Sequence, residues 1–247
     1  MSFMMPYSIE AGPKVATILV RMSPPCIQVA PVKTEEMMLH SPFFVRNHEM
    51  RSAPDPKMSP RLFVGLPISD SVRIHYAEIL DRHGLRSLPG LSWVLPRNLH
   101  LTLDFIGRTP AALVPDLVKA IADSIPPAFE IDFQDFGFFP DQIRPRVFWA
   151  VVQNGRTELQ IWAKNLTSMI DGLLHRQRPD PAFIPHLTLA RIKDRRIRTS
   201  SFLPHFSNAR FGKFQTDRVV LYRSELGSGP PTYTNLFEAR LSGADST

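Results

Sequence analysis

Apolar and polar residues alternate most regularly in two short stretches of the chain, residues 100–103 and residues 186–189. Both stretches read His-Leu-Thr-Leu, so the same tetrapeptide recurs 86 positions later (186 − 100). Successive side chains of a strand point to opposite faces. Each stretch therefore predicts a strand that carries His and Thr on one face and two leucines on the other.

The remaining pattern predicts a chain in which strands and helices alternate. Runs rich in branched and aromatic residues predict strands, and apolar residues at helical spacing predict helices. Pro and Gly residues mark where most of these elements end. The expected strands are 61–66, 100–106, 129–139, 146–151, 186–192, 219–223 and 233–237, and the expected helices lie within 69–84, 110–122 and 157–174.

Two helix starts have a recognisable capping signal. Ser69 is a good N-cap for the first helix, whose apolar positions are Val72, Tyr76, Ile79 and Leu80. Residues 157–160, Thr-Glu-Leu-Gln, form a capping-box pattern for the third helix. The apolar stripe that follows includes Leu159, Trp162, Ala163, Leu166, Met169, Ile170, Leu173 and Leu174, and we interpret it as a packing face. The second helix has two candidate starts, Pro110 and Pro115.

An internal repeat connects the two tetrapeptides. Residues 61–66 resemble residues 146–151 at an offset of 85 (146 − 61), close to the offset of 86 between the tetrapeptides. Each half of the chain therefore reads strand, helix, His-Leu-Thr-Leu strand. This order predicts a bilobal α+β fold with pseudo-twofold symmetry. We expect each tetrapeptide to present His and Thr to a central cleft and its leucines to the helices of its own lobe.

Residues 1–60 differ from the rest of the sequence. They hold eight of the nine methionines and nine of the 24 prolines, and they show no sustained apolar period. We predict an N-terminal extension that is disordered, and a functional protein that begins near Met58. The predicted organisation is an extension at 1–60, one domain at 61–241 and a C-terminal tail at 242–247.

Composition limits the partners and the compartment. The net charge of +6 is consistent with polyanionic partners or phosphate-bearing substrates, and equally with a mildly basic surface that serves only solubility. A single cysteine, Cys26, excludes a disulfide within the chain, which fits a reducing compartment, so we expect a cytoplasmic location. We also expect a monomer. No apolar run approaches the roughly 18 residues that span a bilayer, so we expect no membrane partner.

Two His-x-Thr pairs facing one cleft suit acid-base chemistry. Histidine titrates near neutrality, so one can act as base while the other acts as acid. Threonine hydroxyls can hold phosphoryl oxygens without adding charge. Two histidines do not complete a zinc site, and we expect neither metal nor cofactor. Alternation places Asp104 on the His100 face, where we interpret it as an orienting or surface carboxylate rather than a metal ligand.

The paired motifs resemble those of the 2H phosphoesterase superfamily. Flanking stretches at 61–64, 93–107, 185–191 and 221–226 are similar to its RNA 2′,3′-cyclic phosphodiesterase branch, the LigT-like proteins, and the resemblance covers about residues 61–241. It implies the bilobal α+β fold, with antiparallel sheets around the cleft. It also implies metal-independent hydrolysis of RNA 2′,3′-cyclic phosphate ends, or of cyclic nucleotides, to 2′-phosphates.

The same resemblance implies a role for five residues. His100 would be the proton donor to the departing 3′ oxygen and His186 the proton acceptor for water, while Thr102, Thr188 and Arg191 would bind the phosphate. Strict alternation places Arg191 on the leucine face, opposite His186. Either the strand ends or bulges there, or the guanidinium reaches around, or Arg191 is structural.

Other substrate contacts are less specific. Phe138, Phe139 and Trp93 are candidates for base stacking, although we expect core positions for them. Arg144 and Arg146 are candidates for the RNA backbone. We interpret the charged run 193–198 as a surface loop. Two alternative functions share these motifs: a phosphodiesterase acting on another small substrate, such as a cyclic nucleotide or ADP-ribose cyclic phosphate, and a non-catalytic RNA-binding module.

Overall fold

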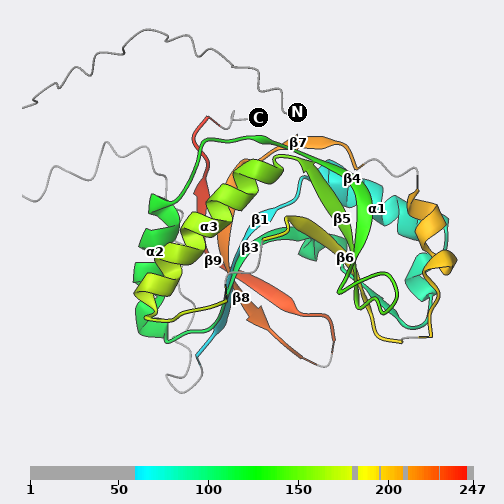
Figure 1. Ribbon diagram of the computed structural model, residues 1–247, viewed down its shortest axis with the longest axis horizontal. Coiled ribbons are helices and arrows are strands. Elements are labelled where there is room, and N and C mark those ends of the chain that lie inside the picture. The colour runs from blue at the N-terminus through cyan, green and yellow to red at the C-terminus, as the bar shows by residue number, and fades with distance from the viewer. Residues whose placement is uncertain (1–58, 180–182, 195, 208–210, 228, 244–247) are drawn as a thin grey trace, which may run out of the picture. The chain divides into compact units, whose positions relative to one another are not determined.

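The computed structural model describes residues 59–247 apart from 180–182, 195, 208–210, 228 and 244–247 (Figure 1). The predicted extension at 1–60 and the proposed start at Met58 therefore lie almost entirely outside the described residues. So does most of the predicted tail at 242–247. These predictions about domain organisation stay predictions.

The described residues form an antiparallel sheet with three α-helices and five short 3-10 helices. All seven predicted strands and all three predicted helices are present. The two additional strands, β2 and β7, have three residues each, which is too short for a periodic pattern to reveal. The strands are β1 (Arg61–Pro67), β2 (Leu91–Trp93), β3 (His100–Arg108), β4 (Glu130–Phe139), β5 (Val147–Asn154), β6 (His186–Ile192), β7 (Lys213–Gln215), β8 (Arg218–Glu225) and β9 (Thr232–Arg240). The helices are α1 (Asp70–Arg82), α2 (Val114–Asp123) and α3 (Arg156–Leu173), with 3-10 turns η1 (Leu85–Ser87), η2 (Pro96–Asn98), η3 (Ala111–Leu113), η4 (Thr199–Ser201) and η5 (Leu203–Phe206).

The two lobes share one sheet, whose strand order is β7-β4-β5-β6-β3-β1-β8-β9. Strands β3, β1, β8 and β9 form the first lobe, and β6, β5, β4 and β7 form the second. Within the described residues, β3 and β6 pair at a single position, Leu101 opposite Leu187. Farther along, β6 pairs with β2 instead, so β3 and β6 diverge. The predicted bilobal α+β fold is confirmed, with the two antiparallel sheets joined at this point.

Helices α1 and α3 pack on the opposite lobes from those that the sequence led us to expect. Helix α3 follows β5 but packs against β3, where Thr167 donates a hydrogen bond to Asp104 (3.3 Å). Helix α1 follows β1, yet its Tyr76 hydroxyl donates to the carbonyl of Leu189 in β6 (2.8 Å). Figure 1 shows α2 and α3 on one side of the molecule and α1 on the other. The prediction was wrong because an apolar stripe identifies the buried face of a helix but not the sheet that it meets.

Helix α1 forms as its sequence predicts. The Ser69 hydroxyl accepts a hydrogen bond from the Val72 amide (3.5 Å), which satisfies one of the free donors of the first turn. The buried residues are Val72, Tyr76, Ile79 and Leu80, the four predicted from their spacing. Gly84, at a φ of 59°, follows the last turn.

Two details of the other helices differ from expectation. Helix α3 begins one residue before Thr157, with Gly155 at its N-cap and no side-chain cap among the described residues, so the capping-box prediction was wrong. A Cβ at Gly155 would lie 2.7 Å from the carbonyl oxygen of Glu130, and its φ of 78° also favours glycine. Met169 is 37% exposed and does not belong to the buried stripe. Helix α2 begins at Val114, with Pro115 in its first turn.

Candidate active site

A β-bulge interrupts the alternation of β6 just after its Thr. Trp149 of β5 pairs with Thr188, and the next residue back, Phe148, pairs with Ala190. Leu189 is therefore the extra residue, and both Leu189 and Ala190 are buried. Arg191 consequently returns to the face of His186 and Thr188, where it is exposed. Of the readings open from the sequence, the bulge is the correct one.

Strand β3 has a bulge at the same place in its tetrapeptide. Gly65 of β1 pairs with Thr102, and Val64 pairs with Asp104, so Leu103 is the extra residue. Asp104 is turned away from the His100 face and is only 5% exposed. The expectation that Asp104 lies on the His100 face was wrong for the same physical reason that brings Arg191 to the His186 face.

The five residues predicted to form the site lie in one cleft of about 880 Å³. They are His100, Thr102, His186, Thr188 and Arg191. The antiparallel pairing of Leu101 with Leu187 brings the two tetrapeptides side by side in opposite directions, so each His approaches the Thr of the other copy. The two copies therefore form a single site at the junction of the lobes.

Both histidines are oriented by a carbonyl two residues upstream. His100 Nδ1 lies 2.7 Å from the carbonyl oxygen of Asn98, and His186 Nδ1 lies 2.7 Å from that of Ile184. A carbonyl oxygen only accepts, so Nδ1 carries the hydrogen in each ring. Nε2 is then the nitrogen that is available to take up or release a proton.

Aromatic rings surround each histidine. The Phe63 ring lies 4.8 Å from that of His100, centroid to centroid, and the Tyr233 ring lies 5.3 Å away. On the other side, Phe139 lies 5.0 Å from His186. Packing against these rings restricts the orientation of both imidazoles and removes them partly from water.

This burial changes the proton affinity of both histidines. Desolvation lowers the pKa of His100 to about 4, although the hydrogen bond to Asn98 opposes the change and the nearby Arg191 adds to it. Desolvation also lowers the pKa of His186, against the hydrogen bond to Ile184. Both imidazoles are therefore neutral at pH 7. An anion placed between them would favour the protonated forms.

The sequence matches the family described as LigT like phosphoesterase over residues 66–149 and 157–233. An RNA 2′,3′-cyclic phosphodiesterase of Aquifex aeolicus is 32% identical over 190 residues, which cover 74% of this chain and 98% of that relative. The chain belongs to the LigT-like phosphoesterase family. The matched segments contain both His-x-Thr motifs and Arg191.

Two further comparisons show how far the similarity extends. An RNA 2′,3′-cyclic phosphodiesterase of Methanothermobacter thermautotrophicus is 29% identical over 191 residues, covering 74% of this chain and all of that relative. The crystal structure of TT0787 of Thermus thermophilus superposes with a TM-score of 0.61 at 27% identity, covering 75% of this chain and 100% of that one. The fold is thus shared with TT0787 over the whole length of that chain.

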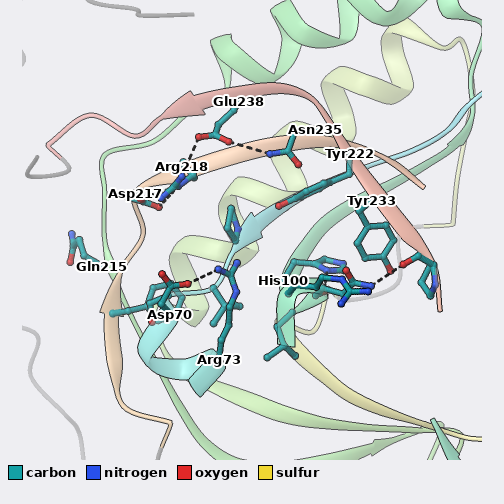
Figure 2. Close-up of a pocket in the computed structure, with 18 of the residues that line it drawn as sticks. Asp70, Arg73, His100, Gln215, Asp217, Arg218, Tyr222, Tyr233, Asn235 and Glu238 are labelled. Carbon is teal, nitrogen blue, oxygen red and sulfur yellow. Dashed lines mark hydrogen bonds and ion pairs between the residues drawn. The ribbon is translucent and has the colours of Figure 1, made fainter. Parts of the chain in front are cut away.

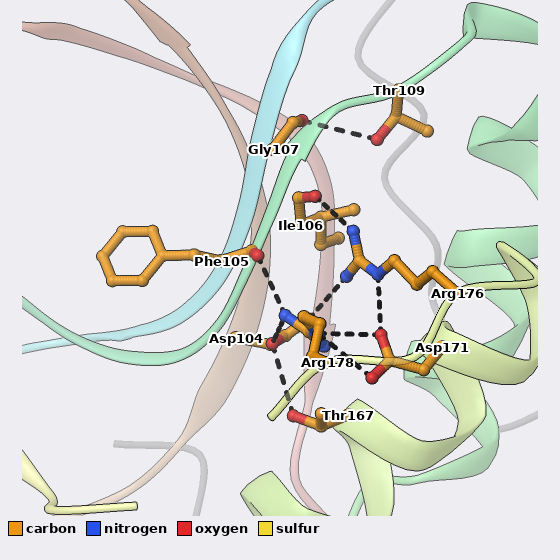
Figure 3. A network of polar contacts seen from close by, with 9 residues as sticks. All are labelled: Asp104, Phe105, Ile106, Gly107, Thr109, Thr167, Asp171, Arg176 and Arg178. Atoms are coloured by element: carbon orange, nitrogen blue, oxygen red, sulfur yellow. Dashed lines mark hydrogen bonds and ion pairs between the residues drawn. The ribbon is translucent and has the colours of Figure 1, made fainter. Parts of the chain in front are cut away.

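Behind the cleft, Asp104 is the centre of a polar network (Figure 3). Its Oδ1 accepts from Arg178 Nη1 (2.7 Å), and Arg176 lies 3.8 Å away. Both arginines also pair with Asp171 near the end of α3, at 2.8 Å and 2.7 Å respectively. The network connects β3, next to its bulge, to helix α3, and Arg178 Nη1 also donates a hydrogen bond to the carbonyl oxygen of Phe105 (3.1 Å).

The remaining sequence candidates divide into core and surface positions. Trp93 and Phe138 pack against Phe148, as expected for core residues, although Trp93 also reaches the wall of the cleft. Arg144 and Arg146 are exposed in the loop between β4 and β5, and their contact with RNA stays a prediction. In the run 193–198, Arg196 pairs with Asp194 on the surface, but Lys193 lines the cleft.

Phe105 is the main site residue that the sequence did not reveal. It lies in the cleft and is 64% exposed. Alternation alone gives no reason to select it, and an aromatic residue in a strand usually indicates a core position. The signal that identifies it is positional, since Phe105 follows His100 by the same five residues by which Arg191 follows His186.

Proposed function

We propose that this protein hydrolyses RNA 2′,3′-cyclic phosphate ends to 2′-phosphates by two-histidine acid-base catalysis. The observation that carries the proposal is the geometry of the cleft, in which two oriented imidazoles, two hydroxyls and one guanidinium share a space with no carboxylate among the described residues that line it. The family supports it, because the relatives from Aquifex aeolicus and Methanothermobacter thermautotrophicus are named RNA 2′,3′-cyclic phosphodiesterases.

In the proposed reaction His186 Nε2 takes a proton from the attacking water as the new P–O bond forms. His100 Nε2 gives its proton to the 3′ oxygen as the P–O3′ bond breaks, so the product is a 2′-phosphate. Thr102 and Thr188 donate hydrogen bonds to the non-bridging oxygens. Arg191 stabilises the charge that develops on them, because a guanidinium can donate two hydrogen bonds to one phosphoryl group.

Substrate binding supplies the protonation state that this reaction needs. The half-buried His100 is neutral before binding, since its pKa is about 4. A phosphodiester anion beside the ring favours imidazolium and raises this pKa. The site would therefore hold the acid in its active form only while the substrate is bound.

Phe105 gives the proposed site a place for a nucleobase. Its ring is exposed in the cleft on the strand that also carries His100. Bases stack on exposed aromatic rings in many proteins that bind single-stranded nucleic acid. The substrate would then lie with its phosphate toward Arg191 and its nucleoside toward Phe105.

The proposal is tested by incubating the protein with 2′,3′-cyclic mononucleotides and with an oligoribonucleotide that ends in a cyclic phosphate, with EDTA present. We expect 2′-phosphate products, identified by ³¹P NMR, and no product with a His100→Ala variant. Absence of hydrolysis of every substrate, or formation of a 3′-phosphate, would contradict the proposal. Activity that EDTA abolishes would contradict a metal-independent reaction. Hydrolysis restricted to mononucleotides would favour a small cyclic nucleotide as substrate.

None of the helices in the described part of the chain is both long and apolar enough to cross a membrane. Two predictions about the whole protein, its monomeric state and its cytoplasmic location, need separate experiments. The predicted monomeric state is tested by sedimentation velocity, and the cytoplasmic location by fractionation of cells that produce the protein.

A further inference from the structure

A second cavity, of about 1100 Å³, adjoins the cleft on the far side of His100 (Figure 2). It is lined by residues at the start of α1, in β8 and β9 of the first lobe, and in β7 of the second lobe. Asn98, His100, Pro231 and Tyr233 line both the cleft and this second cavity. Asn98 Nδ2 donates a hydrogen bond to the carbonyl oxygen of Pro231 (2.9 Å) at the boundary. The two spaces are therefore neighbours that share a wall.

Two of the three arginines that line the second cavity are paired with carboxylates. Arg73 pairs with Asp70 (2.8 Å), and Arg218 pairs with Asp217 (2.8 Å) and Glu238 (3.3 Å). Figure 2 shows these groups around a common space. A site for a free phosphate would offer several unpaired cations, because acidic neighbours repel the ligand. This lining does not suit a bare anion.

The same lining does suit a ribonucleoside. Carboxylates accept hydrogen bonds from base amino groups and ribose hydroxyls, while the arginines and the Asn235 amide donate to base oxygens and nitrogens. Tyr222 and Tyr233 add aromatic surface at the end near His100. Ligand sites of roughly 300–1,000 Å³ hold drug-sized molecules, so a nucleotide fits the volume.

One exposed cation lies near the boundary between the cleft and the second cavity, where a bound RNA strand would pass from one to the other. Arg97 lines the second cavity next to Asn98, and its side chain is exposed. No ion pair involves Arg97 among the residues that the structure describes. It is placed to meet a phosphodiester that connects a nucleotide in the second cavity to one in the cleft.

We propose that the second cavity binds the nucleotide that precedes the cyclic-phosphate end of an RNA chain. The direction follows from the reaction, and the inference therefore rests on the proposed function. If His100 protonates the 3′ oxygen, the ribose lies on the His100 side of the phosphorus. The 5′ side of this ribose then leads toward the second cavity. The protein would bind RNA ends more tightly than mononucleotides.

Binding of a product-like ligand tests this inference without depending on turnover. Calorimetric titration compares adenosine 2′-phosphate with a triadenylate that ends in a 2′-phosphate. We expect the trinucleotide to bind about tenfold more tightly, the order of effect that contacts to one additional base produce. Wild-type affinities that are equal for the two ligands would overturn the inference. So would a stoichiometry of two for the mononucleotide, which would indicate an independent nucleotide site.

A matched pair of variants tests whether the additional nucleotide binds in the second cavity. Asn235→Trp fills the second cavity, whereas Thr234→Trp adds the same bulk at the adjacent exposed position outside its lining. We expect the affinity ratio of trinucleotide to mononucleotide to fall close to one in Asn235→Trp and to stay at the wild-type value in Thr234→Trp. Equal ratios in both variants would overturn the inference.

A second pair on helix α1 avoids added bulk. Arg73→Gln removes a cation from the second cavity, and Arg82→Gln removes an exposed one from the end of the same helix. We expect the affinity ratio to fall in Arg73→Gln alone. The proposed function and this inference fail in separate experiments. Absence of cyclic-phosphate hydrolysis contradicts the proposed function, whereas equal binding of the two product-like ligands contradicts the second-cavity inference.

Discussion

The half-site on β3 and the half-site on β6 have the same backbone conformation but different side chains. Each begins with His, continues through a hydroxyl, and bulges at its second leucine. The sequence of buried and exposed positions is the same over the seven residues that can be compared. The difference comes directly after the bulge, where β3 has Asp104-Phe105 and β6 has Ala190-Arg191.

The repeated backbone and the single residues that differ between the lobes contribute different parts of the site. The repeat supplies two imidazoles and two hydroxyls, a nearly symmetric set. The position five residues after each His breaks the symmetry, with a cation in one lobe and an aromatic ring in the other. A cyclic phosphate end is itself asymmetric, with charge at one side and a nucleoside at the other. The two lobes are therefore suited to opposite sides of one substrate.

Replacing either histidine tests whether the two lobes share the catalytic work. We expect His100→Ala and His186→Ala each to lower kcat by at least about a hundredfold, the contribution typical of a general acid or base. Steady-state hydrolysis of a 2′,3′-cyclic mononucleotide measures the effect, and circular dichroism confirms folding. A variant that kept nearly full activity would remove that histidine from the reaction.

The cation of the second lobe should matter next most. Arg191→Gln removes the guanidinium while keeping an amide donor, and we expect kcat/KM to fall by about tenfold to a hundredfold. Arg191→Lys keeps the charge but not the paired donors, so it should recover only part of the loss. Equal activity of the Lys variant and the wild type would show that charge alone is needed.

The sequence predicted much of this site but reversed one part of it. The repeat placed both histidines and both threonines correctly, because alternation holds from His to Thr. Beyond the bulge, alternation assigned Asp104 to the cleft and Arg191 to the core face, and both assignments were wrong. Leu103 and Leu189 are ordinary strand residues that give no local sign of a bulge. Only the family resemblance pointed to Arg191 in the site.

The limits on the fold prediction have a similar origin. Spacing identified the buried residues of α1, including Tyr76, because burial of one helix face depends on local periodicity. It did not reveal that Tyr76 reaches Leu189 in the other lobe, because that contact joins residues 113 positions apart in the sequence. Strand β7 was missed because three residues carry too little pattern.

Asp104 tests whether the bulge in the first lobe depends on its buried ion pairs. Asp104→Ala leaves Arg176 and Arg178 without this partner, and we expect a loss of about 2 kcal/mol in the free energy of unfolding, because both arginines keep some contact with solvent and with Asp171. Urea denaturation measures it. Glu78→Ala, an exposed position on α1, serves as the control and should change stability little. An Asp104 variant as stable as the control would show that the network does not hold the bulge.

The aromatic residue of the first lobe should have a smaller effect than the cation of the second. We expect Phe105→Leu to raise KM about fivefold through weaker base stacking, with little change in kcat. Kinetics with a cyclic mononucleotide measure both parameters. A change in kcat without a change in KM would indicate that Phe105 acts on the histidines instead.

The smallest expected effect is on pH dependence. Burial lowers the pKa of both histidines, so the base becomes available, and the acid is lost, at lower pH than for free imidazole. We expect kcat/KM, which reports the free enzyme, to be highest below about pH 6.5, and kcat to peak at higher pH because the bound anion raises both pKa values. A kcat/KM that still rises at about pH 8 would contradict this expectation.

A substrate with a sulfur in place of the 3′ oxygen tests the division of labour most directly. A thiolate leaves without protonation, whereas an alkoxide needs an acid. With a 2′,3′-cyclic 3′-phosphorothiolate we expect His100→Ala to hydrolyse the substrate at close to the wild-type rate and His186→Ala to stay strongly impaired. Equal impairment of both variants on this substrate would contradict the assignment of His100 as proton donor and His186 as proton acceptor.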